Sequence, residues 1–311
     1  MRDTVLIVGS GLMGSGIAAC SALAGNPTVL IDLDAEAAEK GVRSALACVE
    51  ELCSNGLAGP EAAGRAKDLI ACGNDAGAFR DSAKLVIEAI FENLEAKQNL
   101  FAELDGIFPA EVPLISNTSG LRITDIAAKT RMPERTVTAH FWFPAHLVPL
   151  VEVVIGDRTD PAVAEEVRDI LLEWGKAAVL VKKDLPGQLA NRILQAVIRE
   201  AVNIVQMGLA SPEDIDTAVK MGMGIRFPVW GPLEHIEAVG LDLALNVQRT
   251  VLPEISDSKT PAHCLQELVS QGNLGYKTGQ GFYDWSVKDM DALAARRNAF
   301  IIAARKFMQE N

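Results

Sequence analysis

The sequence lacks any uninterrupted apolar run near the length that spans a lipid bilayer, and it contains no internal repeat or low-complexity segment. An excess of positive charge is also missing, because 41 acidic residues against 29 lysines and arginines give a formal net charge of -12. A chain of this charge is repelled at long range by phosphate backbones and anionic membrane surfaces. We therefore expect neither a membrane nor a nucleic-acid partner, and an anionic ligand must be held by local groups.

Paired cysteines are absent as well. The five cysteines show no spacing typical of a zinc site or a disulfide framework, and they stand at Cys20, Cys48, Cys53, Cys72 and Cys264. This pattern predicts no metal site and fits a reducing cytoplasm. The first apolar run begins so close to Met1 that a signal peptide has no room before it, so we do not expect secretion.

What the chain does contain is the composition of an ordinary globular protein, with 49% apolar and 23% charged residues in a length of 311. This length suits one large domain and a smaller one, each with its own core. Short apolar runs rich in β-branched residues predict a series of strands separated by helices. The predicted strands are 4–8, 28–31, 85–90, 114–115, 136–139, 150–154 and 178–181.

Three glycines at the spacing of a dinucleotide-binding loop directly follow the first predicted strand and open a helix. In such a loop they permit a tight turn, close approach of a pyrophosphate and close helix packing, and the helix N-terminus offers N–H groups to the phosphates. Asp32 ends the second strand, where its carboxylate can accept hydrogen bonds from the ribose. No arginine near Asp32 would pair with a 2′-phosphate, so NAD is favoured over NADP. The residues expected to bind NAD here are Gly9, Gly11, Leu12, Met13, Gly14 and Asp32.

The order of elements predicts an α/β fold with a doubly wound Rossmann sheet, followed by an all-α C-terminal domain. Residues 35–72 are expected to form a helical hairpin inserted into the sheet domain. After 182–187 the pattern changes, and 188–207 is typical of one long amphipathic helix. We therefore predict an NAD-binding domain over 1–184 and a helical domain for substrate binding and dimerisation over 185–311.

Two ionisable residues lie in or just after strands of the predicted sheet, and His140 is placed where side chains of such sheets face the ligand crevice. His140 follows the strand 136–139, and Glu152 interrupts the apolar strand 150–154. A buried carboxylate needs a partner, and the simplest partner is His140, whose protonated form it would stabilise. Such a pair could act as acid and base in alcohol oxidation by NAD. The alternative from these residues alone is a purely structural pair.

Several further stretches follow the glycine loop in a characteristic order: 86–94 with Lys97, 116–121, 140–141, 150–153, 184–187 with Asn191 and Arg192, 231–232, and 277–283. With these stretches, nearly the whole chain resembles the L-3-hydroxyacyl-CoA dehydrogenase family. The resemblance implies a place in fatty acid metabolism and a homodimer formed by the helical domain, with substrate bound between the domains. By this resemblance His140 is the acid–base residue and Glu152 orients it. The other implied contacts are Glu92, Lys97 and Asn117 with the cofactor, and Ser119 and Asn191 with the substrate oxygen.

The chain departs from the acyl-CoA enzymes of this family at three places, of which the first two concern the substrate site and CoA. Their segment His-Phe-Phe-Asn-Pro here ends in Phe143-Pro144, so an aromatic ring replaces an amide beside the substrate. Their hairpin carries several lysines for the CoA phosphates, whereas 41–72 here has only Arg43, Arg65 and Lys67 against four acidic residues. Phe143 is therefore expected to line the substrate site, and CoA would find little cationic support.

A third stretch, 222–234, resembles the branch that contains L-gulonate 3-dehydrogenase and lambda-crystallin. Arg226 in it could bind a free carboxylate bidentately or form an ordinary salt bridge. Our hypothesis is a compact 3-hydroxy acid anchored by Arg226, with the acyl-CoA thioester as the close alternative. Dehydrogenation of gulonate, carnitine or a pyridine carboxylate, and a catalytically silent crystallin-like NAD-binding protein, also remain open.

Overall fold

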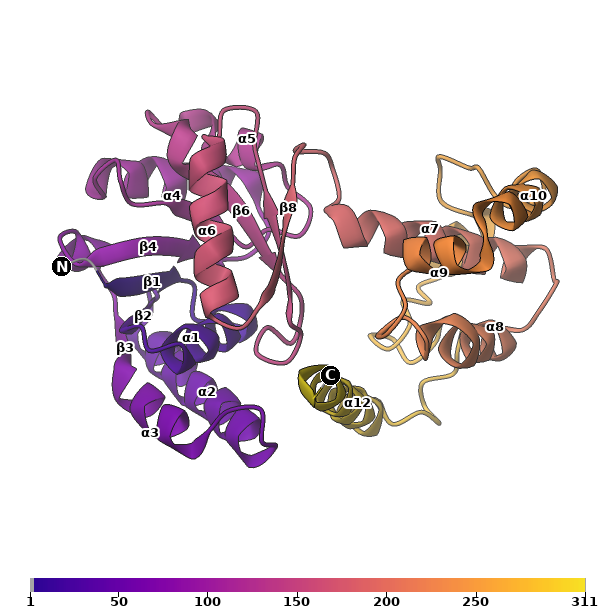
Figure 1. Ribbon diagram of the computed structural model, residues 1–311, viewed down its shortest axis with the longest axis horizontal. Coiled ribbons are helices and arrows are strands. Elements are labelled where there is room, and N and C mark those ends of the chain that lie inside the picture. Colours follow the sequence, from indigo (N-terminus) through magenta and orange to yellow (C-terminus); the bar gives the residue numbers. More distant parts are fainter. Residues whose placement is uncertain (1–2, 311) are drawn as a thin grey trace. The chain divides into compact units, whose positions relative to one another are not determined.

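A computed structural model describes residues 3–310, and the chain divides into two compact units, 1–189 and 190–311 (Figure 1). The first unit contains one eight-stranded sheet in the order β3-β2-β1-β4-β5-β6-β7-β8. Its strands are β1 (Thr4–Val8), β2 (Thr28–Ile31), β3 (Ile70–Gly73), β4 (Ala83–Glu88), β5 (Leu114–Ser116), β6 (Thr136–Phe141), β7 (Leu150–Val154) and β8 (Ala177–Val181). All neighbouring strands are parallel except the pair β6 and β7.

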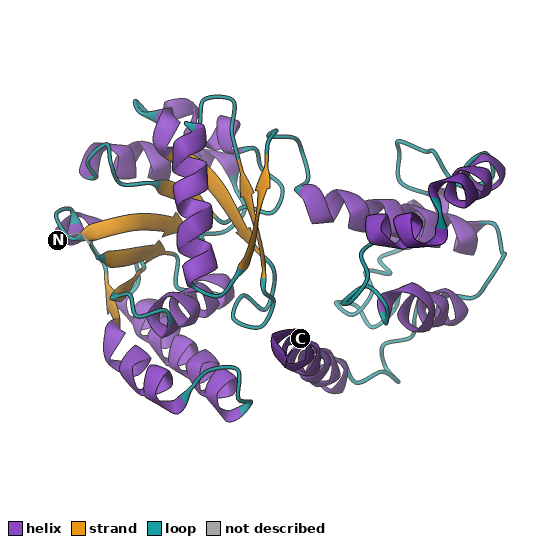
Figure 2. Cartoon of the chain, in the orientation of Figure 1, coloured by secondary structure: helices purple, strands orange, loops and turns teal. Residues whose placement is uncertain are grey.

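Helices cover both faces of this sheet, as expected for strands that are buried on both sides. One apolar cluster joins the sheet to α1 (Leu12–Leu23), α2 (Ala35–Ser54), α3 (Pro60–Leu69) and α6 (Pro161–Glu173). A second cluster joins the opposite face to α4 (Leu94–Ile107) and α5 (Ile123–Ile126). The predicted fold class, a doubly wound sheet with a helical hairpin and a helical C-terminal part, is confirmed (Figure 2).

Some sequence-based boundaries were wrong. The strand predicted over 85–90 lies two residues earlier, at Ala83–Glu88. The hairpin ends at Leu69, and Ile70–Gly73 forms the edge strand β3 beside β2 instead of helix. This segment is short and partly exposed, so pairing with β2 rather than its own pattern makes it a strand. Strand β6 also continues to Phe141, because its last residues pair with the antiparallel β7; His140 therefore lies within the strand rather than after it.

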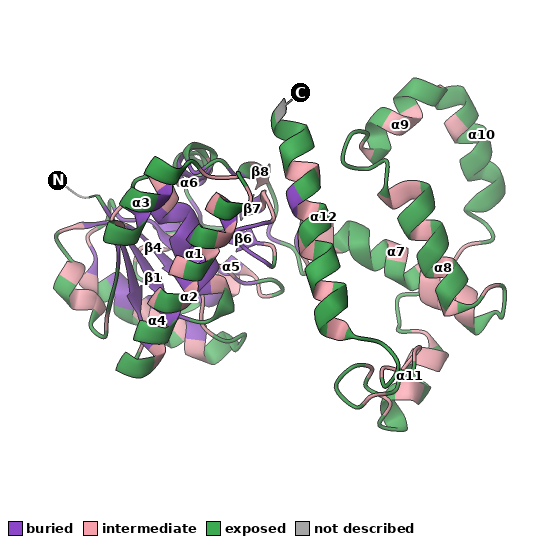
Figure 3. Ribbon diagram, turned by 90° about the horizontal axis from the view of Figure 1, so that it is seen from below, coloured by how far each residue is buried: buried purple, intermediate pink, exposed green. Residues whose placement is uncertain are grey.

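The second unit consists of helices, and no strand longer than an isolated bridge occurs within its described residues, 190–310. The helices are α7 (Leu189–Gln206), α8 (Pro212–Ala218), α9 (Pro232–Val239), α10 (Leu241–Val251), α11 (His263–Ser270) and α12 (Met290–Glu310). Among residues 190–309 only Ile302 is buried, whereas buried residues fill the sheet unit (Figure 3). No described helix is both long and apolar enough to cross a membrane.

Candidate active site

The glycine loop lies at the point where the strand order changes direction, between β1 and β4. Gly9 has a φ of +106°, and a Cβ at this position would come within 2.6 Å of the Ala89 carbonyl oxygen after β4. A Cβ at Gly14 would meet the Gly9 oxygen at 1.9 Å, so α1 can start this close to the strand only with glycine there. A Cβ at Gly11 would meet nothing within 4 Å, so the loop is open where a pyrophosphate would approach. The loop therefore fits a dinucleotide.

Asp32 is fixed by the same loop. Its Oδ2 accepts hydrogen bonds from the backbone N–H of Ser10 at 3.0 Å and from the Ser10 hydroxyl at 2.6 Å. Partial burial opposes ionisation of Asp32, but the hydrogen bonds from Ser10 outweigh it and lower the pKa of the carboxyl. An ionised carboxylate at the end of β2 suits two ribose hydroxyls and repels a 2′-phosphate. Ser10 was missed from the sequence, where it is one of the variable positions of the glycine motif.

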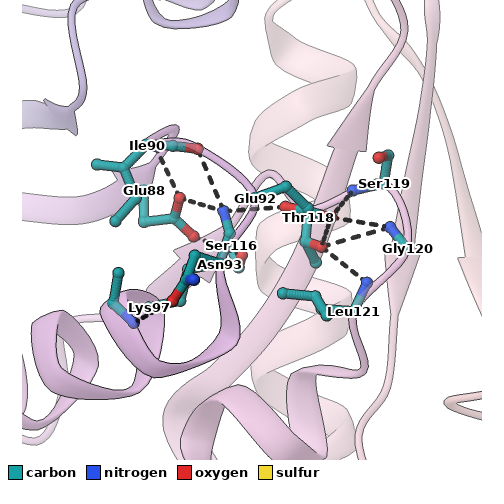
Figure 4. Close-up of polar contacts among 11 residues, drawn as sticks. Glu88, Ile90, Glu92, Asn93, Lys97, Ser116, Thr118, Ser119, Gly120 and Leu121 are labelled. Atoms are coloured by element: carbon teal, nitrogen blue, oxygen red, sulfur yellow. Dashed lines mark hydrogen bonds and ion pairs between the residues drawn. The ribbon is translucent and has the colours of Figure 1, made fainter.

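A buried ion pair stands at the end of the neighbouring strand β4 (Figure 4). Lys97 Nζ lies 2.5 Å from Glu88 Oε1, and the two side chains are 1% and 0% exposed. Glu88 also accepts hydrogen bonds from the Ile90 backbone N–H at 2.8 Å and from the Ser116 hydroxyl at 2.6 Å. The pair thereby ties α4 and β5 to β4. Glu88 was missed, although an acidic residue in an apolar strand is the same signal that identified Glu152.

Glu92 links this pair to the loop that carries Ser119. Its Oε2 lies 3.3 Å from Lys97 Nζ, while its Oε1 accepts from the Thr118 hydroxyl at 2.6 Å and from the backbone N–H groups of Ser119 and Gly120 at 3.2 and 3.1 Å. Burial opposes ionisation, but the Thr118 hydrogen bond and the charge of Lys97 together lower the pKa of Glu92. The Glu92 carboxylate thus holds the backbone of the Ser119 loop, with Ser119 itself exposed.

Asn117, on the same loop, reaches the strand that bears the histidine. Its side-chain oxygen accepts a hydrogen bond from the backbone N–H of Phe141 at 2.9 Å. The backbone N–H of Asn117 donates to the Glu88 backbone carbonyl at 2.8 Å. Asn117 therefore sets the position of the end of β6 relative to β4.

His140 and Glu152 face each other across the antiparallel pair β6 and β7. His140 Nδ1 lies 2.7 Å from Glu152 Oε2, and the Glu152 side chain is fully buried. Residues directly opposite in such a pair project to the same face, which is why these two meet. The same Oε2 accepts a hydrogen bond of 3.0 Å from the indole Nε1 of Trp142, a contact that was not foreseen from the sequence.

Most of the predicted residues of the sheet unit lie at or just after the carboxyl ends of β1, β2, β4, β5 and β6. The exceptions are Glu152, which lies in β7 opposite His140, and Lys97, which lies in α4. Phe143 lies just beyond β6 and is 50% exposed. Asn191 and Arg226 belong to the helical unit. Asn191 lies in the first turn of α7, and Arg226 lies just after a π-helical turn, Val219–Gly224. Their substrate roles remain predictions. No group of three or more metal-binding side chains occurs among the described residues.

Comparison with known proteins decides the family. Residues 4–185 match the NAD-binding domain of 3-hydroxyacyl-CoA dehydrogenase, and residues 187–285 match its C-terminal domain. The chain belongs to the 3-hydroxyacyl-CoA dehydrogenase family. As a member of this family, it is an NAD-dependent oxidoreductase that acts on a small molecule.

Similar members of the family differ in substrate. The chain is 34% identical to 5-formyl-3-hydroxy-2-methylpyridine 4-carboxylate 5-dehydrogenase of Mesorhizobium japonicum, over 99% of both chains. It is 38% identical to a probable 3-hydroxybutyryl-CoA dehydrogenase of Bacillus subtilis, over 91% of this chain and 98% of the relative. A crystal structure of the pyridine-carboxylate 5-dehydrogenase, described as an NAD+-dependent dismutase, superimposes with a TM-score of 0.91 at 33% identity over 99% of each chain. The family alone therefore leaves the substrate open.

Proposed function

We propose that this family member interconverts a compact 3-hydroxy acid and its 3-keto form, with His140 and Glu152 as the acid–base pair. The observation that carries the proposal is the 2.7 Å contact between His140 Nδ1 and the buried Glu152 carboxylate. In oxidation, His140 Nε2 takes the hydroxyl proton, and Glu152 stabilises the imidazolium; in reduction, Nε2 returns the proton. Bound NAD supplies the acceptor or donor of the hydride.

The cofactor and the reacting oxygen are assigned to separate groups. The glycine loop (Gly9, Gly11, Leu12, Met13 and Gly14) and Asp32 hold the adenosine and pyrophosphate, with Glu92 and Asn117 nearer the nicotinamide. Lys97 contributes through Glu92, because its ammonium is buried. Ser119 and Asn191 donate to the substrate oxygen, which gains negative charge during reduction. The rigid hold of Glu92 on the Ser119 loop supports this assignment.

A free acid is favoured over a CoA thioester by the charges on the hairpin. Three of its four cations, Lys40 being the fourth, already pair with a glutamate: Arg43 with Glu39, Arg65 with Glu61, and Lys67 with Glu50. These exposed pairs are weak, yet a CoA phosphate placed there would also meet three carboxylates. The hairpin thus offers no net positive charge to bind the phosphates of CoA.

Arg226 is proposed to bind the carboxylate of this acid. Its Nε donates to the Gly222 carbonyl at 3.0 Å, and no carboxylate among residues 3–310 forms an ion pair with its guanidinium. The terminal nitrogens are therefore available for a bidentate contact with an anion. Phe143 would lie against the body of the substrate in place of the amide of the acyl-CoA enzymes.

A pyridine carboxylate is the second candidate substrate, favoured by the TM-score of 0.91 to the pyridine-carboxylate 5-dehydrogenase. It would use the same base and the same arginine, and Phe143 could stack on the ring. Two further hypotheses from the sequence stand beside it: membership of 222–234 in the branch that contains L-gulonate 3-dehydrogenase and lambda-crystallin, and a carnitine substrate.

A substrate panel with an arginine variant tests the substrate class. The absorbance of reduced nicotinamide reports the reaction rate. We expect kcat/KM for 3-hydroxybutyrate or a related free acid to exceed kcat/KM for 3-hydroxybutyryl-CoA. Arg226→Gln should raise KM for the acid about 10- to 100-fold, because a charge-assisted contact is lost. KM for NAD should not change. Arg249→Gln, which removes another exposed arginine of the helical unit, serves as the control. Robust turnover of the thioester with none of any free acid would refute the proposal.

We also propose that the protein works as a homodimer formed by the helical unit, in the cytoplasm. Support comes from this unit's large apolar side chains, many of which are exposed, for example Ile193, Leu243, Leu245 and Phe300. Monomeric proteins rarely expose so much apolar surface. Light scattering at micromolar protein should give twice the mass of one chain, and a monomer mass would contradict the dimer. The five free cysteines fit a reducing cytoplasm.

A further inference from the structure

Glu152, the carboxylate that contacts the proposed base His140, has a second hydrogen-bond partner, Trp142, just after the end of β6. Glu152 Oε2 accepts from Trp142 Nε1 at 3.0 Å as well as contacting His140 Nδ1 at 2.7 Å. The Glu152 side chain is 0% exposed, so these N–H groups replace water as its hydrogen-bond donors. One oxygen thus joins the histidine to an indole.

The chemistry of the two donors differs. An imidazole nitrogen can donate or accept, depending on its tautomer, whereas an indole N–H can only donate. Trp142 therefore holds Oε2 as an acceptor and limits rotation of the carboxylate group. With Oε2 so placed, the favoured tautomer of neutral His140 carries its proton on Nδ1 and leaves the lone pair on Nε2.

The indole also lies against the histidine ring. The centroids of the His140 and Trp142 rings are 5.6 Å apart, with the planes tilted by 51°. Phenylalanine, which occupies this position in the usual motif of the acyl-CoA enzymes, could make this ring contact but could not donate to Glu152. Ring packing could therefore be supplied by phenylalanine, whereas the hydrogen bond to Glu152 requires the indole N–H of Trp142.

We propose that Trp142 is a positioning residue of the His140–Glu152 pair, acting through its indole N–H on the Glu152 carboxylate. The inference rests on the proposed acid–base function. A phenylalanine at the same position would lack this donor.

Kinetics of single and double variants test the inference. Trp142→Phe keeps a ring but removes the N–H, and we expect kcat to fall about tenfold, equivalent to about 1.4 kcal/mol. KM for NAD and for substrate should stay within about twofold of wild type. In a Glu152→Ala background, where the acceptor is gone, adding Trp142→Phe should cost less than about twofold more. Trp174→Phe, which alters an indole in the apolar core next to α6, should leave kcat unchanged.

Two kinetic results would overturn the inference: wild-type kcat in Trp142→Phe, or the same tenfold loss with and without Glu152. The second result would mean that the indole acts by packing. Failure of the underlying function is recognised separately, because His140→Gln would then keep full turnover whatever Trp142 does.

Nuclear magnetic resonance gives a test that does not require Trp142→Phe to fold. The chain has four tryptophans, so the indole N–H signal of Trp142 can be assigned by elimination with phenylalanine variants of the other three. A hydrogen bond to a carboxylate should place this signal downfield of the others, and Glu152→Gln should move it upfield. An unmoved signal would contradict the contact.

Discussion

Replacing His140 with glutamine is expected to lower kcat by about 10²- to 10⁴-fold, the range typical of losing a general acid–base group. Glutamine is close to histidine in size and can still hydrogen-bond to Glu152, so the strand pair β6 and β7 should remain intact. It cannot take up the proton that leaves the hydroxyl group. The loss should appear in kcat and kcat/KM alike, because the proton transfer belongs to the transition state.

The binding of NAD should survive this substitution, because Asp32 is held by hydrogen bonds from Ser10, whereas His140 contacts Glu152. Titration of the cofactor, followed by fluorescence of reduced nicotinamide, measures this directly. His263→Gln removes an exposed histidine of α11 and should keep normal turnover. Near-normal turnover of His140→Gln would remove the imidazole from the reaction.

Local patterns in the sequence predicted the parts of the site that depend on short segments. The run 4–8, the glycine spacing and Asp32 each follow from the turn and strand geometry of one βαβ unit. The contact between His140 and Glu152 was also predictable, because a carboxylate in an apolar strand requires a nearby partner. Its register, His140 opposite Glu152 in an antiparallel pair, could be read only from the structure.

Other features depend on contacts between distant segments. Strand β3 has a weak pattern of its own, and it forms because β2 offers it a hydrogen-bonding edge. The grip of Glu92 on Thr118 and Gly120 joins segments 26 and 28 residues apart. The sequence analysis drew nothing from Trp142, because only the structure shows where its indole N–H lies. Sequence periodicity carries no information on such side-chain contacts.

Replacing Lys97 with methionine is expected to lower the free energy of unfolding by about 3–5 kcal/mol. Methionine fills a similar volume but leaves the carboxylate of Glu88 buried without its counter-ion. The remaining donors to Glu88, the Ser116 hydroxyl and the Ile90 N–H, are neutral. Urea unfolding measures the loss. Lys129→Met removes an exposed lysine whose ammonium donates to the neutral side chain of Asn99, and it should cost far less.

A second substitution separates the charge effect from packing. Adding Glu88→Gln to Lys97→Met removes the uncompensated charge, so the double variant should be more stable than Lys97→Met alone. If the double variant is instead less stable by the sum of both single losses, the buried charge is not the cause.

The same lysine should affect turnover, because Lys97 holds Glu92 and Glu92 holds the Ser119 loop. We expect Lys97→Met to lower kcat even at temperatures where it is fully folded. The substitution Lys97→Met should also raise the pKa of Glu92 toward its ordinary value, since the charge of Lys97 is one of the influences that lower this pKa.

A lowered pKa in the folded state gives stability that is present above about pH 4.3 and is lost as the pH falls through the folded-state value. The Glu92 part of the stability difference between wild type and variant should therefore shrink in acid, and unfolding curves across this range would detect it.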